Sequence, residues 1–130
     1  MLKRTKGILT AYYSGFMQDE LDFVQDIVER RPANESERQA EIANQLTLAI
    51  DVIRKQVSTL SEQDKELLRL FFDRRLNNFV TDVAAETGLS TQQCRKSLKR
   101  LTKQMSRHFN GLLKYTMFPL KIGKEKQALL

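Results

Sequence analysis

The residues with the clearest chemical capacity lie between positions 90 and 103, a stretch with polar and basic side chains and no acidic residue. Arginine and lysine donate hydrogen bonds to guanine edges and phosphates, and glutamine pairs with adenine. The stretch is therefore a candidate for binding double-stranded DNA, and a solvated basic surface is the alternative. The candidate residues are Ser90, Thr91, Gln92, Gln93, Arg95, Lys96, Lys99, Arg100 and Lys103.

Position along a helix separates two expected roles for these residues. The residues from Thr91 to Lys96 fall in the first two turns, which is the part of a recognition helix that enters the major groove. Lys99, Arg100 and Lys103 come one to two turns later and are expected to meet phosphates. Arg74 and Arg75, in the polar loop DRRLNN, are further candidates for phosphate contacts, or else side chains in solvent.

Side chains that could support catalysis are few. Cys94 is the one cysteine and His108 the one histidine, and no HExxH, GxSxG or P-loop pattern occurs. Cys94 falls on the apolar side of the helix, where a small buried side chain is expected instead of a nucleophile. The sequence therefore predicts no enzyme, no cofactor and no metal site.

The elements that must position residues 90–103 have the pattern of a helix-turn-helix, VTDVAAETGLSTQQCRKSLKRLTKQM, over residues 80–105. Gly88 stands where the first helix should end in a left-handed residue. Ser90 can cap the second helix, and Gln93 completes a capping box. Ala84 is small enough to let the two helices approach closely.

One apolar core is expected behind this motif. Ser97 and Met105 continue the inner face of the second helix. Because Ser97 stands where such motifs usually carry Ile or Val, either the helix register is slightly altered or Leu98 carries the packing. The predicted core residues are Leu67, Phe71, Val83, Ala84, Leu89, Cys94, Leu98 and Leu101.

The segments LSEQDKELLRLFF and NNFVTDVAAETGLSTQQCRKSLKRLTKQM resemble region 4 of bacterial sigma-70-type factors. As a whole, the chain is similar to small phage late-gene transcription activators of the ArpU and RinA type. The match covers about the C-terminal half by motif, and the N-terminal half only by length and helix pattern. The resemblance implies sequence-specific DNA binding and activation of phage or phage-like genes.

The N-terminal half is predicted to be helical. Residues 1–6 are expected to form a frayed basic leader, and Tyr12, Tyr13 and Phe16 are expected in the core. A helix over 21–31 should end before Pro32, and Asn34 or Ser36 should cap a long helix over 37–59. Its apolar stripe, from Ile42 to Leu60, is longer than an eleven-residue partner can cover, so the rest is expected to need the C-terminal helices or a second subunit. A homodimer or a contact with RNA polymerase is predicted.

Later in the chain, Ser61 should cap a third helix, with Asp64 in the capping-box position. The helix that starts at Ser90 is expected to continue to about residue 109. The predicted organisation is an N-terminal helical segment (1–60), a helix-turn-helix region (61–111) and a C-terminal docking segment or tail (112–130). The fold class is expected to be all-α.

Charge is unevenly distributed within a net charge of +6. Residues 1–90 hold twelve Lys and Arg against fifteen Asp and Glu, whereas residues 91–130 hold ten against one. A basic end of this kind is typical of nucleic-acid binders. No signal peptide or membrane-spanning stretch is apparent, so a cytoplasmic protein without a membrane partner is expected.

Three functions remain open from the sequence. The first is a DNA-binding transcriptional activator, and the second is a sigma-like adaptor that mainly binds RNA polymerase. The third is a module whose basic face binds an acidic protein.

Overall fold

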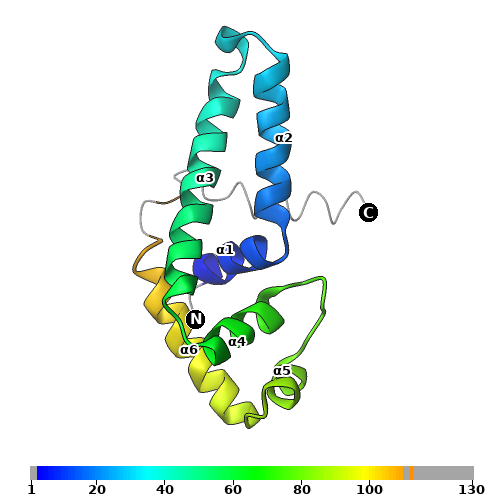
Figure 1. Cartoon of the computed structure of the whole chain (residues 1–130), viewed down its shortest axis with the longest axis vertical. Coiled ribbons are helices and arrows are strands. Elements are labelled where there is room, and N and C mark those ends of the chain that lie inside the picture. The colour runs from blue at the N-terminus through cyan, green and yellow to red at the C-terminus, as the bar shows by residue number, and fades with distance from the viewer. Residues whose placement is uncertain (1–2, 110–111, 113–130) are drawn as a thin grey trace.

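The computed structural model describes residues 3–109 and residue 112, and every regular element in this part of the chain is a helix (Figure 1). The predicted all-α class is confirmed. Residues 1–2, 110–111 and 113–130, which include most of the predicted C-terminal segment, lie outside the described residues. In chain order the elements are α1 (Lys3–Tyr13), α2 (Phe16–Arg30), the 3₁₀ turn η1 (Ala33–Glu35), α3 (Glu37–Ser58), α4 (Glu62–Phe72), α5 (Val80–Thr87) and α6 (Thr91–Ser106).

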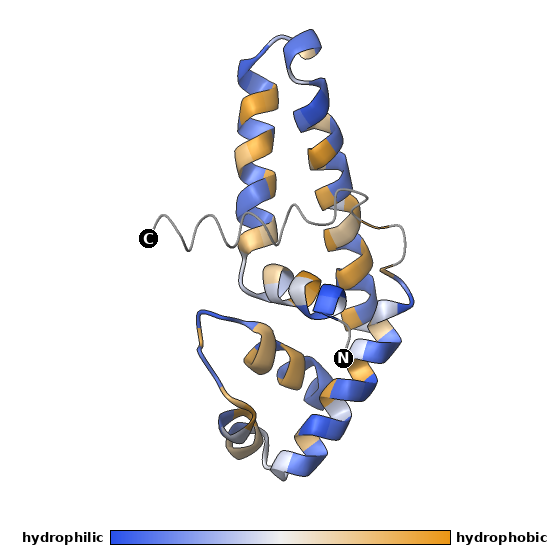
Figure 2. Cartoon of the chain, turned by 180° about the vertical axis from the view of Figure 1, so that it is seen from behind, coloured by the Kyte–Doolittle hydropathy of each residue, from blue (hydrophilic) through white to orange (hydrophobic). Residues whose placement is uncertain are grey.

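Helices α2 and α3 form a long antiparallel hairpin that extends away from the other helices (Figure 1). Apolar residues recur at three- and four-residue steps on each helix, so each has one stripe to bury. Leu21 and Val24 of α2 and Leu46 and Ile53 of α3 are buried. Figure 2 shows these apolar stretches along both helices, separated by hydrophilic turns of the same helices.

Helix α2 begins at Phe16, so the prediction of a helix starting at residue 21 is wrong. Gly15 has a φ of 80°, and this left-handed residue allows α1 to end and α2 to begin almost at once. The resulting α2 has fifteen residues, which cover more of α3 than the expected eleven. The apolar stripe of α3 therefore gives weaker support to a homodimer or a polymerase contact than the expected eleven-residue helix did.

Helix α3 begins at Glu37 as predicted and ends at Ser58. Ser36 holds the N-cap position, but its hydroxyl donates to the carbonyl of Pro32 (3.2 Å) and does not cap the helix. Asn34 lies within η1 and is not a cap of α3 either.

Helix α1 corrects the expectation of a frayed leader, because the helix already begins at Lys3. Ile8 and Leu9 are 1% and 0% exposed. The helix contacts α4 and α6 as well as α2. Tyr12, Tyr13 and Phe16 are half-buried against the core, so their predicted core role is confirmed.

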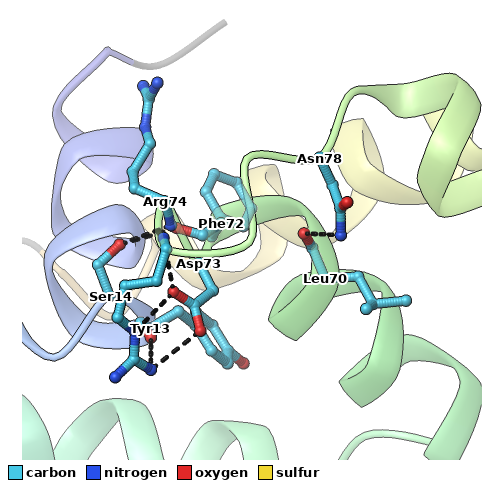
Figure 3. Close-up of polar contacts among 8 residues, drawn as sticks. Tyr13, Ser14, Leu70, Phe72, Asp73, Arg74 and Asn78 are labelled. Carbon is cyan, nitrogen blue, oxygen red and sulfur yellow. Dashed lines mark hydrogen bonds and ion pairs between the residues drawn. The ribbon is translucent and has the colours of Figure 1, made fainter.

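Buried Ser14 joins the end of α1 to the end of α4 (Figure 3). Its hydroxyl donates to the carbonyl of Phe72 (3.2 Å) and accepts from the backbone amide of Arg74 (2.9 Å). A buried hydroxyl with both of its roles satisfied avoids the cost of an unpaired polar group. The loop that leads to α5 is therefore fixed to the N-terminal helix.

Candidate nucleic-acid interface

The turn between α5 and α6 has the conformation that its sequence predicts. Gly88 is left-handed, with a φ of 75°, and the backbone amide of Leu89 donates to the carbonyl of Ala84 (3.2 Å). The Ser90 side chain accepts from the amide of Gln93 (3.1 Å), and the Gln93 side chain accepts from the amide of Ser90 (3.0 Å). This reciprocal capping box fixes the start of α6.

The inner faces of α5 and α6 meet in the core that was predicted. Leu67, Val83, Ala84, Cys94, Leu98 and Leu101 are all buried. Phe71 and Leu89 are only partly buried, at the edge of the same cluster. Ser97 is half-buried, so the packing passes to Leu98 as expected.

Thr102 is a buried residue of α6 that the apolar pattern did not include. It is 1% exposed, and its hydroxyl donates to the carbonyl of Leu98 (2.7 Å). Because that bond satisfies the hydroxyl within the helix, a polar residue can occupy the inner face.

The outer face of α6 carries the residues that could read DNA. Gln92, Arg95, Lys96, Lys99 and Lys103 are exposed, and Thr91 is half-buried. The side chains of the four cations among them form no hydrogen bond or ion pair with any residue in the described part of the chain. In Figure 2 the ribbon of α6 is largely hydrophilic. These groups are therefore available to an external anion.

Arg100 differs from the neighbouring cations, because the structure places it in an ion pair. Its Nη2 lies 3.1 Å from Oδ2 and 3.2 Å from Oδ1 of Asp64 on α4. The amide of Asp64 also donates to the Ser61 side chain (3.2 Å), as its predicted capping position requires. Arg100 thus connects α6 to the start of α4, and a phosphate contact would compete with this pair.

Arg75 is also held within the protein, by an ion pair with Asp73. Its guanidinium donates to both carboxylate oxygens of Asp73, each at 2.9 Å, and to the carbonyl of Tyr13 (3.3 Å). Hydrogen bonding from Arg75 holds the pKa of the buried Asp73 carboxyl below its usual range. Arg74 is exposed, and its side chain has no partner among the described residues.

Two cations that were not among the predicted contacts also lie on the surface. Arg107 is exposed one turn after Lys103 and follows the end of α6. The helix ends at Ser106, earlier than the predicted end near residue 109. Its spacing of four from Lys103 was a signal for it. Lys6 belongs to α1 and lines a cavity with Arg74, and only the tertiary arrangement relates these two.

The described residues hold no group of three or more His, Cys, Asp or Glu side chains placed to bind a metal ion. None of the described helices combines the length and the apolar character that crossing a membrane requires. Comparison of the chain with protein-family models, with curated proteins and with solved structures finds no match.

Proposed function

We propose that this protein is a sequence-specific DNA-binding transcriptional regulator whose helix α6 enters the major groove. The observation that carries the proposal is the outer face of α6, where four cations and Gln92 stand exposed and unpaired behind a capped turn. A major groove admits one α-helix, and the donors on this face are those that bind guanine, adenine and phosphate.

The arrangement of α5 and α6 supports the proposal further. In a helix-turn-helix, the second helix reads bases from its N-terminal turns while the first crosses the backbone. Here Gln92, Arg95 and Lys96 lie in the first two turns of α6, and the capping box gives those turns a defined start. The resemblance to activators of the ArpU and RinA type makes activation of phage or phage-like late genes the expected outcome of binding.

The test is selection of a preferred site from a random duplex library, followed by binding measurements on the selected and a scrambled duplex. A variant with Arg95, Lys96, Lys99 and Lys103 all changed to Gln should lose binding to the selected duplex and to the scrambled duplex. The control is Arg38→Gln with Lys55→Gln, which removes two exposed cations of α3. If the wild-type protein binds no duplex, or shows no preference among duplexes, sequence-specific binding is contradicted.

A second function, as a sigma-like adaptor for RNA polymerase, is favoured by the hairpin. Phe23 on α2 and Leu48 on α3 are 62% and 49% exposed. Large exposed apolar side chains on a projecting element suit a protein partner. Tight binding of the isolated protein to duplex favours the regulator, whereas binding that requires polymerase favours the adaptor.

A further inference from the structure

A second cationic feature lies outside α6, in a cavity of about 300 Å³ between α1 and the loop that joins α4 to α5. Lys6 and Thr10 of α1 line one side of it. Arg74, Asn77, Asn78 and Phe79 of the loop line the other side. The site is therefore built from two segments that are distant in the sequence.

The cavity is positive because its one acidic lining residue is already neutralised. Asp73 is held by Arg75 through two hydrogen bonds of 2.9 Å. Lys6 and Arg74 have no side-chain hydrogen bond or ion pair with any residue that the structure describes. Figure 3 shows the Arg74 side chain extending alongside α1, away from the Asp73 side chain.

The location suits a nucleic-acid backbone. Val80, the first residue of α5, also lines the cavity. Helix α5 is the element that crosses the backbone if α6 occupies the groove. Phe79 beside it is 70% exposed, which leaves an apolar ring where a sugar next to a bound phosphate would pass.

We propose that this cavity binds one phosphate of the DNA backbone, with Lys6 and Arg74 as its two ligands. The inference rests on the proposed function and extends it to a contact outside the recognition helix. An arginine fork and a lysine ammonium together satisfy several oxygens of one phosphate. Asn77 also lines the cavity, whereas the side-chain amide of Asn78 already donates to the carbonyl of Leu70 (3.3 Å).

The test compares Lys6→Gln, Arg74→Gln and the double variant with the wild type on selected and scrambled duplexes. Each single variant should bind both duplexes roughly tenfold more weakly, as expected for losing a charged hydrogen bond. Because one phosphate is shared, the double variant should be little weaker than either single one. The negative slope of the log association constant against log salt concentration should become shallower by about 0.9 in all three variants. Arg38→Gln with Lys55→Gln is the matched control.

A single neutral methylphosphonate placed at successive backbone positions locates the contact. One position should weaken the wild-type protein and have no further effect on the double variant. Thermal melts of all variants should match the wild type, because neither the Lys6 nor the Arg74 side chain forms a hydrogen bond or ion pair with a described residue. If the Gln variants bind like the wild type while changes on α6 abolish binding, the cavity does not hold a phosphate and the proposed function stands. If the wild type binds no duplex, the proposed function itself fails.

Discussion

Gln92 and Gln93 are adjacent residues of one type with different surroundings. Gln93 uses its side chain to accept from the Ser90 amide, whereas Gln92 is exposed with no partner among the described residues. The same contrast separates Arg95 from Arg100, which is paired with Asp64. Only the unpaired member of each pair is free to contact DNA without breaking a bond within the protein.

The first prediction separates base reading from phosphate binding on α6. Gln92→Ala or Arg95→Ala should cost about 1–3 kcal/mol on the preferred duplex and little on a scrambled one. Lys99→Ala or Lys103→Ala should weaken both nearly equally and reduce the salt slope by about one unit. Gln93→Ala is the control, since it should lower stability through the lost cap while leaving the preference unchanged. Equal losses on both duplexes for Gln92→Ala and Arg95→Ala would show that α6 does not read bases.

The second prediction concerns Asp73, whose pKa is lowered by hydrogen bonds from Arg75. A carboxyl with a depressed pKa stabilises the fold above its unfolded pKa and loses that contribution as the pH falls through the folded value. Asp73→Asn should therefore cost about 1 kcal/mol of unfolding free energy near neutral pH, and the difference from wild type should shrink below about pH 4. Urea titrations at several pH values measure this difference.

The control for Asp73 is Asp51→Asn. Asp51 and Arg54 form an exposed pair at 3.9 Å on α3. Such surface pairs contribute little, so the change should cost less than about 0.5 kcal/mol at any pH. A pH-independent effect of Asp73→Asn would contradict the role given to its charge.

At the scale of elements, we expect the contact of α5 with α6 to depend on a small residue. Ala84 is 5% exposed, and its neighbour Ala85 is exposed on the same helix. Ala84→Leu should overpack this contact and cost about 1–3 kcal/mol, whereas Ala85→Leu should be nearly neutral. Thermal melts of the two variants check the prediction, and equal melting temperatures would contradict the assigned helix register.

The sequence predicted those parts of α5 and α6 that depend on neighbours in the chain. Gly88, Ser90 and Gln93 form the turn and the capping box within six consecutive residues. Local turn chemistry is therefore sufficient to identify them. The Arg100–Asp64 pair and the Lys6–Arg74 cavity depend on how helices fold back on one another. Helical periodicity shows which face of each helix is buried, but not which cation meets which carboxylate across two helices.

The start of α2 was missed for a related reason. Phe16, which follows the left-handed Gly15, was expected in the core with Tyr12 and Tyr13, and not in the first turn of a new helix. Glycine in a left-handed conformation can end one helix and start another within two residues. The pattern of apolar residues alone does not distinguish these outcomes.

At the scale of the whole molecule, the hairpin of α2 and α3 and the turn between α5 and α6 lie at opposite ends (Figure 1). Residues 16–58 hold nine acidic residues against five basic ones, while the described part of α6 holds no acidic residue. The two surfaces proposed to bind partners, the hairpin for a protein and α6 for DNA, therefore differ in charge and lie apart.

The fourth prediction tests this division with Phe23→Ser and Leu48→Ser together. Phe23 is 62% and Leu48 is 49% exposed, so the free energy of unfolding should change by less than about 0.5 kcal/mol. Duplex binding should be unaffected. Capture of RNA polymerase should weaken roughly tenfold if the hairpin carries an apolar anchor for it. The double change Arg38→Gln and Lys55→Gln is the surface control, and unchanged capture by the Ser variant would exclude the hairpin as that contact.

Helix α1 has a consequence for the order in which the chain folds. It is synthesised before the other described helices, yet it packs against α4 and α6, and Arg4 donates to the carbonyl of Leu112 at the far end of the described chain. Contacts between such distant segments form only after a long loop has closed, which slows folding. The contacts of α1 with α4 and α6 therefore form only after most of the described chain has been made. The packing of α1, α4 and α6 against one another is complete only once α6, the last described helix, has emerged.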